Sequence, residues 1–163
     1  MNQLSTKGLS LLKTLEGFRN APYDDQTGKD TDSWVAGATV GFGHLIDRDE
    51  WDEFKDGVTR EEAERLLRQD LRPFVNAVRN KTQTPLSQHQ FDALVIFTFN
   101  IGRTAFRNSS VLKLINRPQA NTQYRNLESA WKAWNRSQGQ VMEGLKRRRA
   151  IEWQLFESGR YRK

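Results

Sequence analysis

Two carboxylic acids near the N-terminus have the spacing and surroundings for acid–base catalysis. Glu16 closes a helical pattern of apolar residues, and a carboxyl group at the edge of an apolar face tends to keep its proton. Asp25 lies nine residues later in a polar turn. Glycoside hydrolysis needs such a combination, because one carboxyl group protonates the leaving oxygen while the other serves a water molecule or the anomeric carbon. A structural explanation stays open, in which Glu16 pairs with Lys13 or Arg19 and Asp25 only shapes the turn.

Other catalytic classes lack the residues that they need. The 163-residue chain has no cysteine, which excludes disulfides, thiolate metal sites and a cysteine nucleophile. Its histidines, His44 and His89, follow no metal-binding spacing, and the acids around Asp30 do not match a calcium loop. The glycines beside Phe42 do not form a phosphate loop, and we expect them to bring backbone close to a substrate or another segment. We expect no metal and no cofactor.

Periodicity and capping signals predict the elements that position the two acids. A first helix ends at about Glu16, and the glycine-punctuated residues 17–58 form a small, irregular β-lobe. A capping box at Thr59 opens a helix to about Lys81, with a kink or break just before Pro73. The strand-like pieces of the β-lobe are Val35-Ala36, Thr39-Val40 and Phe42.

The remainder of the chain is predicted to be helical. Ser87 and Gln90 form a second capping box, and the helix that follows is apolar on nearly every side until Gly102, which is typical of a central buried helix. Shorter helices are predicted at about 110–115, 123–134 and 141–157.

Strands near one end of the chain and helices after them indicate the α+β class. The length fits one domain. We expect the first helix and β-lobe at about 1–58, the helical lobe at about 59–163, and a substrate cleft between the two lobes.

Charge is distributed unevenly along the chain. The net charge is +6, yet residues 21–60 carry ten acids against four bases, a net charge of −6, so the remainder carries +12. A basic surface attracts anionic polymers, nucleic acid or anionic lipid. No nucleic-acid-binding motif accompanies the bases, so we expect no specific nucleic-acid partner. The basic segment 144–163 either lies on an anionic outer membrane as an amphipathic helix or packs into the core.

Short motifs occur along nearly the whole chain: Glu16-Gly17-Phe18-Arg19, Tyr23-Asp24-Asp25, Ala38-Thr39-Val40-Gly41-Phe42-Gly43-His44, Gln90-Phe91-Asp92-Ala93-Leu94, Phe99-Asn100-Ile101-Gly102 and Gly144-Leu145-Lys146-Arg147-Arg148-Arg149. In this order they resemble the phage-type lysozymes, glycoside hydrolase family 24. The resemblance implies the phage-lysozyme fold, in which a long helix joins a β-lobe to a helical lobe. It also implies an endolysin, a muramidase that hydrolyses the β-1,4 bond between N-acetylmuramic acid and N-acetylglucosamine in peptidoglycan and so lyses the host cell.

The resemblance assigns roles to individual residues. Glu16 would be the general acid, and the eight-residue gap of the family's pattern selects Asp25 rather than Asp24 as the second acid, which positions the attacking water together with Thr39. Thirteen residues separate Asp25 from Thr39, more than in the most compact members. This longer loop, which includes Trp34, would extend the cleft and alter the substrate subsites.

Four further positions match the family. His44 and Asp70 correspond to a structural pair between the lobes of relatives. Asn100 corresponds to a substrate contact, or it is a buried residue that ends a helix. Arg148 lies in the family's Arg-Arg segment, where it faces or braces the cleft, or belongs to a solvated basic face.

The implied partner is peptidoglycan, whose carboxylates make it anionic. The apolar stretch near the N-terminus is interrupted by Lys13, and we find neither a signal peptide nor a transmembrane segment. We expect synthesis in the host cytoplasm and action on the cell wall, in the periplasm, after another protein has permeabilised the membrane. We also expect a monomer, because the sequence shows no exposed seam for association.

Overall fold

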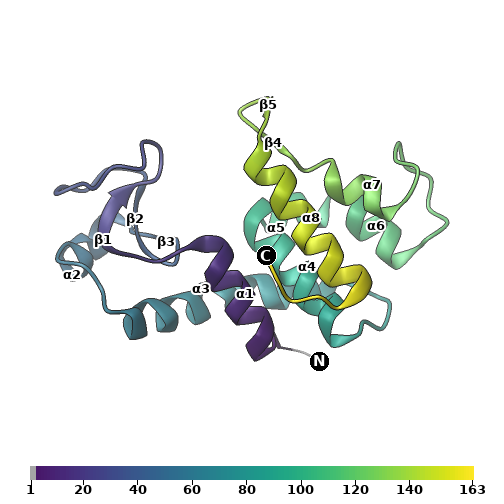
Figure 1. The fold of residues 1–163 in the computed structure, drawn as a ribbon, viewed down its shortest axis with the longest axis horizontal. Coiled ribbons are helices and arrows are strands. Elements are labelled where there is room, and N and C mark those ends of the chain that lie inside the picture. The colour runs from purple at the N-terminus through teal and green to yellow at the C-terminus, as the bar shows by residue number, and fades with distance from the viewer. Residues whose placement is uncertain (1–2) are drawn as a thin grey trace. The chain divides into compact units, whose positions relative to one another are not determined.

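The computed structural model describes residues 3–163, and within that range it contains helices, a three-stranded sheet and a two-stranded hairpin (Figure 1). The chain forms two units: the sheet unit, Lys13–Arg72, and the helical unit, which comprises the chain up to Leu12 together with Pro73–Lys163. The division falls inside two helices, α1 (Thr6–Glu16) and α3 (Arg60–Lys81), and not near residue 58. Each of these helices therefore contributes residues to both units.

The sheet is antiparallel, with strand order β1-β2-β3: β1 (Arg19–Asp24), β2 (Ala38–Gly41) and β3 (His44–Leu45). Asp24 pairs with Ala38 and Thr39 pairs with Leu45, and all four residues of β2 are buried. The predicted small β-lobe is present, but the strand predictions at Val35-Ala36 and Phe42 are wrong, because Phe42 lies in the turn between β2 and β3. We did not predict β1, because Asn, Pro and Asp have low strand propensity.

A close contact between β2 and α3 requires a glycine. Gly41 has φ +71°, and a Cβ at this position would lie 2.9 Å from the Cβ of Ala63. A side chain here would be strained in its backbone and would also collide with the helix. The prediction that these glycines serve close backbone approach is confirmed at Gly41, where the neighbour is a helix of the same unit.

Two capping boxes begin helices where the sequence predicts them. The Thr59 hydroxyl accepts the Glu62 N–H at 3.1 Å, and the Glu62 carboxylate accepts the Thr59 N–H at 3.3 Å. Ser87 and Gln90 form the same reciprocal pair before α4 (Gln88–Ile101). The predicted break before Pro73 is absent, because α3 continues through the proline to Lys81.

The helical unit is built around α4, whose residues Phe91–Thr98 are all buried. Four helices and a short hairpin follow it within the described residues: α5 (Arg103–Arg107), α6 (Ser110–Asn116), α7 (Leu127–Lys132), the hairpin strands β4 (Arg136–Ser137) and β5 (Gln140–Val141), and α8 (Glu143–Ser158). Helix α7 is shorter than predicted, because Asn126 caps it by accepting the Ser129 N–H at 2.8 Å. The hairpin was missed, although Gln138 and Gly139 both adopt the positive φ of a two-residue turn.

The final helix, α8, packs against α4 inside the helical unit (Figure 1). Leu155 is fully buried, and the rings of Trp153 and Phe156 lie 5.7 and 5.2 Å from that of Trp131. These contacts support the packing alternative for segment 144–163, since its apolar side chains are used by the core. Among the described residues, no helix is both long and apolar enough to cross a membrane.

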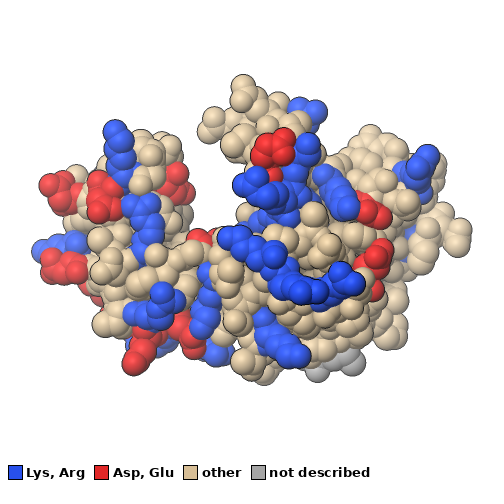
Figure 2. All heavy atoms as spheres, in the orientation of Figure 1, with Lys and Arg blue, Asp and Glu red and all other residues tan. Residues whose placement is uncertain are grey.

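Surface charge follows the asymmetry of the sequence. In the view of Figure 2, Lys and Arg side chains dominate the charged surface of the helical unit, whereas the sheet unit displays many Asp and Glu side chains. Two short helical segments follow β3: η1 (Arg48–Glu50) and α2 (Trp51–Phe54). They carry four acids of the sheet unit, Asp49, Glu50, Asp52 and Glu53.

Candidate active site

Glu16 is the last residue of α1, and it lies beside the glycine that separates β2 from β3. Gly17 follows it with φ +74°, a conformation that commonly ends a helix. A Cβ on Gly43 would lie 3.4 Å from Oε1 of Glu16, so the missing side chain leaves space next to this carboxyl group. The half-buried Glu16 is therefore bounded by backbone of the sheet unit.

The two bases that could have paired with Glu16 bind other acids. The Lys13 ammonium lies 2.5 Å from Glu64, and the Arg19 guanidinium lies 2.7 Å from Asp30. The hydrogen bond from Lys13 and its positive charge lower the pKa of Glu64. Neither Lys13 nor Arg19 therefore forms the ion pair with Glu16 that the structural explanation requires.

Asp24 and Asp25 are neighbours with different tasks. The Asp24 carboxylate accepts the Gln26 N–H at 3.0 Å, which stabilises the turn after β1. Asp25 is exposed, and its N–H donates to the Gly37 carbonyl at 3.0 Å. A Cβ on Gly37 would lie 2.5 Å from Oδ1 of Asp25, so the absence of a side chain at residue 37 sets where that carboxylate can lie.

The same carbonyl connects Asp25 to Thr39. The Thr39 hydroxyl donates to the Gly37 oxygen at 2.9 Å, and Thr39 itself is only 4% exposed. Because its proton is used by this bond, the hydroxyl oxygen presents lone pairs to any further partner. The structure thus joins the two sequence-predicted residues through Gly37, which the sequence analysis did not single out.

Tyr23, on β1, is affected by both candidate acids. Burial raises the pKa of its phenol, the positive charge of Arg19 opposes this shift, and the negative charges of Asp25 and Glu16 both add to it. The Arg19 guanidinium lies 3.9 Å from the centre of the Tyr23 ring. The pKa of this phenol therefore depends on both carboxylates, which lie within the sheet unit.

His44 and Asp70 form a pair within the sheet unit. His44 Nδ1 lies 2.8 Å from Asp70, and Nε2 lies 3.3 Å from Glu50. The hydrogen bond with Asp70 raises the pKa of His44, while partial burial opposes the shift and the charges of Asp70 and Glu50 reinforce it. Glu50 was not predicted as a partner of His44, although Asp47 and Glu50 have the spacing of a capping box.

Asn100 and Arg148 both belong to a polar network of the helical unit, but only Arg148 is buried. Asn100 is exposed, so the alternative in which it is a buried residue that ends a helix is wrong. Asn100 Oδ1 accepts a hydrogen bond from Arg149 at 2.6 Å, and Arg148 donates to Glu152 at 3.1 Å. Glu152 is fully buried, and it also accepts from Arg149 and from the indole N–H of Trp131. The alternative in which Arg148 belongs to a solvated basic face is wrong, because the residue is only 9% exposed.

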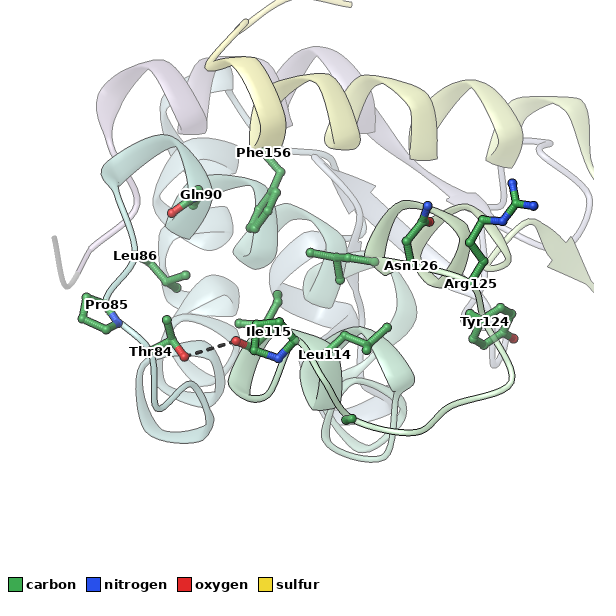
Figure 3. Close-up of a pocket in the computed structure, with 13 residues that line it drawn as sticks. Thr84, Pro85, Leu86, Gln90, Leu114, Ile115, Tyr124, Arg125, Asn126 and Phe156 are labelled. Atoms are coloured by element: carbon green, nitrogen blue, oxygen red, sulfur yellow. Dashed lines mark hydrogen bonds between the residues drawn. The ribbon is translucent and has the colours of Figure 1, made fainter.

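The helical unit also contains a pocket of about 470 Å³ (Figure 3). It is lined mainly by apolar side chains such as Leu86, Leu114 and Phe156, and different residues make up the predicted catalytic set. Its polar groups already serve the fold: Thr84 donates to the Ile115 carbonyl at 3.1 Å, and Asn126 caps α7. We assign this pocket no part in the acid–base chemistry.

Comparisons with known proteins agree with the resemblance seen in the sequence. Residues 13–152 match the family model described as phage lysozyme. The endolysin of Bacillus phage PZA is 36% identical over 96% of this chain, which spans 56% of that protein's length. The endolysin from Escherichia coli O157:H7 phage FAHEc1 has a similar structure, with a TM-score of 0.79, 31% identity, and coverage of 99% of this chain and 97% of that one.

A second solved structure, the muramidase domain of SpmX from Asticcacaulis excentricus, matches with a TM-score of 0.75 and 37% identity, covering 96% of this chain and 98% of that domain. Together these similarities confirm the predicted α+β fold of the phage-lysozyme type. The family match covers most of the chain and includes Glu16, Asp25 and Thr39. The chain belongs to the phage lysozyme family.

Proposed function

We propose that this protein is a phage endolysin of the lysozyme type, a muramidase that hydrolyses the β-1,4 bond between N-acetylmuramic acid and N-acetylglucosamine in peptidoglycan. The observation that carries the proposal is the arrangement around Gly37, whose carbonyl accepts from both Asp25 N–H and the Thr39 hydroxyl. Glu16 lies in the same unit, beside Gly43. The family match supports the reaction class, and this geometry supports the assignment of the residues.

In the proposed reaction, Glu16 donates a proton to the glycosidic oxygen as the bond to the anomeric carbon breaks. Asp25 accepts a hydrogen bond from the attacking water and increases its nucleophilicity. Thr39 accepts a second hydrogen bond from that water, because its own hydroxyl proton is held by Gly37. As the water adds to the anomeric carbon it gives one proton to Asp25, so the products are a reducing sugar end and a free hydroxyl group, and proton exchange with solvent then returns Glu16 to its acid form and Asp25 to its carboxylate.

The charge distribution suits an anionic polymer as substrate. Bases in excess on the helical unit favour association with the carboxylates of peptidoglycan, and this attraction weakens as salt is added. We further propose that the protein acts as a monomer on the cell wall, after synthesis in the host cytoplasm and permeabilisation of the membrane by a separate protein.

The test is digestion of purified peptidoglycan by the wild type, Glu16→Gln and Glu53→Gln, with mass spectrometry of the products. Glu53 is an exposed acid on α2, so its substitution is a matched control for the loss of one carboxylate. We expect new reducing muramic ends from the wild type and the control, and none from Glu16→Gln.

Two other outcomes would contradict parts of the proposal. Anhydro-muramic ends would show a transglycosylase that uses the same site. Binding of peptidoglycan without cleavage by the wild type would show a wall-binding protein with no enzymatic activity.

A further inference from the structure

The loop between β1 and β2 carries a tryptophan that is fixed to the sheet unit. The indole N–H of Trp34 donates to the Ile46 carbonyl at 2.9 Å, and the ring is half-buried. Ile46 is buried, and its own N–H donates to the Ala38 carbonyl at 2.8 Å. Trp34 is therefore attached to the same backbone that holds the sheet together.

An arginine lies over this indole. The guanidinium of Arg48, the first residue of η1, is 4.7 Å from the centre of the Trp34 ring. Arg48 is exposed, and within residues 3–163 its guanidinium forms no hydrogen bond or ion pair, whereas its carbonyl accepts the Trp51 N–H. By contrast, Arg19 stacks on Tyr23 but also binds Asp30. Stacking uses the face of a guanidinium and leaves the N–H groups in its plane available to a ligand.

The Trp34 end of the pair is connected to the proposed catalytic residues by short chain segments and backbone hydrogen bonds. Gly37, three residues after Trp34, accepts from both Asp25 and Thr39. Thr39 on β2 pairs with Leu45 on β3, and the residue after Leu45, Ile46, accepts the hydrogen bond from the Trp34 indole. The segment that places the pair thus also places the water-positioning groups.

The sheet unit otherwise repels the proposed substrate. Residues 21–60 have a net charge of −6, and Arg48 itself lies between Asp47 and Asp49. The muramic residues of peptidoglycan carry a lactyl carboxylate or a stem peptide with its own carboxylates. A supported cation at this place would offset the repulsion locally, since a guanidinium binds a carboxylate through two parallel hydrogen bonds.

We infer that Arg48, held over Trp34, binds a carboxylate of the muramic substituent next to the cleaved bond and thereby strengthens substrate binding. The inference rests on the proposed muramidase function. Arg48 is assigned a role in specificity and none in proton transfer, so its loss raises KM and leaves kcat nearly unchanged.

The test compares Arg48→Gln with Lys55→Gln, which removes the same charge from an exposed residue of the same unit. Three substrates are used: native peptidoglycan, peptidoglycan whose carboxyl groups have been amidated with carbodiimide and methylamine, and glycan stripped of stem peptides by an amidase. On native substrate we expect Arg48→Gln to raise KM about three- to fivefold, as for an exposed but supported ion pair, and Lys55→Gln to have little effect. The difference should vanish on the amidated substrate.

The stripped glycan distinguishes the two sources of the carboxylate. The amidase removes the carboxylates of the stem peptide and exposes the lactyl carboxylate that was bound in the amide. A KM defect that persists there shows that Arg48 binds the lactyl carboxylate, and one that disappears assigns the stem peptide. Trp34→Phe should keep part of the effect and Trp34→Ala should reproduce it, with thermal unfolding confirming that each variant is folded. Equal KM values for Arg48→Gln and Lys55→Gln on every substrate would overturn the inference.

A binding assay separates this inference from the proposed function. Soluble native glycan fragments are titrated into Glu16→Gln and into the double variant Glu16→Gln/Arg48→Gln, neither of which needs to turn over. Weaker binding by the double variant supports the role of Arg48 even if the wild type proves not to cleave. Identical binding by both proteins refutes it even if the wild type is an active muramidase.

Discussion

The substitution Gly37→Ala should separate catalysis from folding. Its Cβ would lie 2.5 Å from Oδ1 of Asp25 and 2.6 Å from Oδ1 of Asp24, whereas an ordinary contact begins at 3.4 Å. The backbone of Gly37 does not have the positive φ that would exclude alanine. The collision involves only the ends of two side chains, so both carboxylates must move, and the fold loses the hydrogen bond from the Gln26 N–H to Asp24, which is worth about 1 kcal/mol.

The required displacement sets the size of the effect. Moving Oδ1 of Asp25 from 2.5 to 3.4 Å is a shift of about 0.9 Å. A misplacement of about 1 Å at a reacting centre lowers the rate about 100-fold, which equals about 2.7 kcal/mol of activation free energy. We expect kcat to fall by this amount and the thermal midpoint to change little.

The assay is the initial rate of reducing-end release from purified peptidoglycan, measured together with thermal unfolding. Gly144→Ala is the matched control, because its Cβ would have only Arg147 nearby, at 3.9 Å. Wild-type activity in a folded Gly37→Ala variant would refute the assignment of Asp25. Loss of activity in proportion to loss of folded protein would refute the separation of catalysis from stability.

Three further predictions concern stability and membranes. The pKa of His44 is raised by its hydrogen bond to Asp70, so this stabilisation is complete below the unfolded pKa of 6.5 and is lost as pH rises through the folded value; urea unfolding from pH 5 to 9 should show a decline above about pH 6.5 that His44→Gln lacks. Glu152→Gln leaves two buried guanidinium groups without their carboxylate and should cost about 3–5 kcal/mol of unfolding free energy in urea, whereas the exposed Glu157→Gln should change it little. The intact protein should not release dye from anionic vesicles, because the apolar side of α8 is packed in the core; leakage equal to that caused by a peptide of residues 141–163 would contradict this packing argument.

The helices could be predicted where their start signals are local. The side chains of Thr59 and Ser87 bond residues three positions later, so each cap is visible in four consecutive residues. β1 and the hairpin β4–β5 escaped prediction because short strands take their stability from partners distant in sequence, and Asp24 pairs with Ala38 across a whole loop. The break predicted before Pro73 is absent, since packing against neighbouring elements can retain a helix through a proline.

The candidate site residues also differ in whether their arrangement depends on nearby or on distant parts of the sequence. Glu16, Asp25 and Thr39 lie within 24 consecutive residues of one unit, so their spacing carries information about how the strands bring them together. Asn100 lies on α4 and its partner Arg149 lies on α8, so this bond depends on packing between helices far apart in sequence. Arg148 and Glu152 are four residues apart on α8, but the sequence did not show that packing buries both of them.

A count of bases could not reveal that network, because it treats every arginine of segment 144–163 as surface charge. Two of those arginines are buried around one glutamate of α8, and both also donate to α4, Arg148 to the Ile96 carbonyl and Arg149 to Asn100, which holds α8 to its own unit. Arg48 shows the opposite case, since it lies in an acidic segment whose summed charge does not reveal a cation supported by an aromatic ring. Net charge predicts long-range attraction, but recognition depends on which cations keep their hydrogen-bond donors available, and only the contacts of each side chain reveal that.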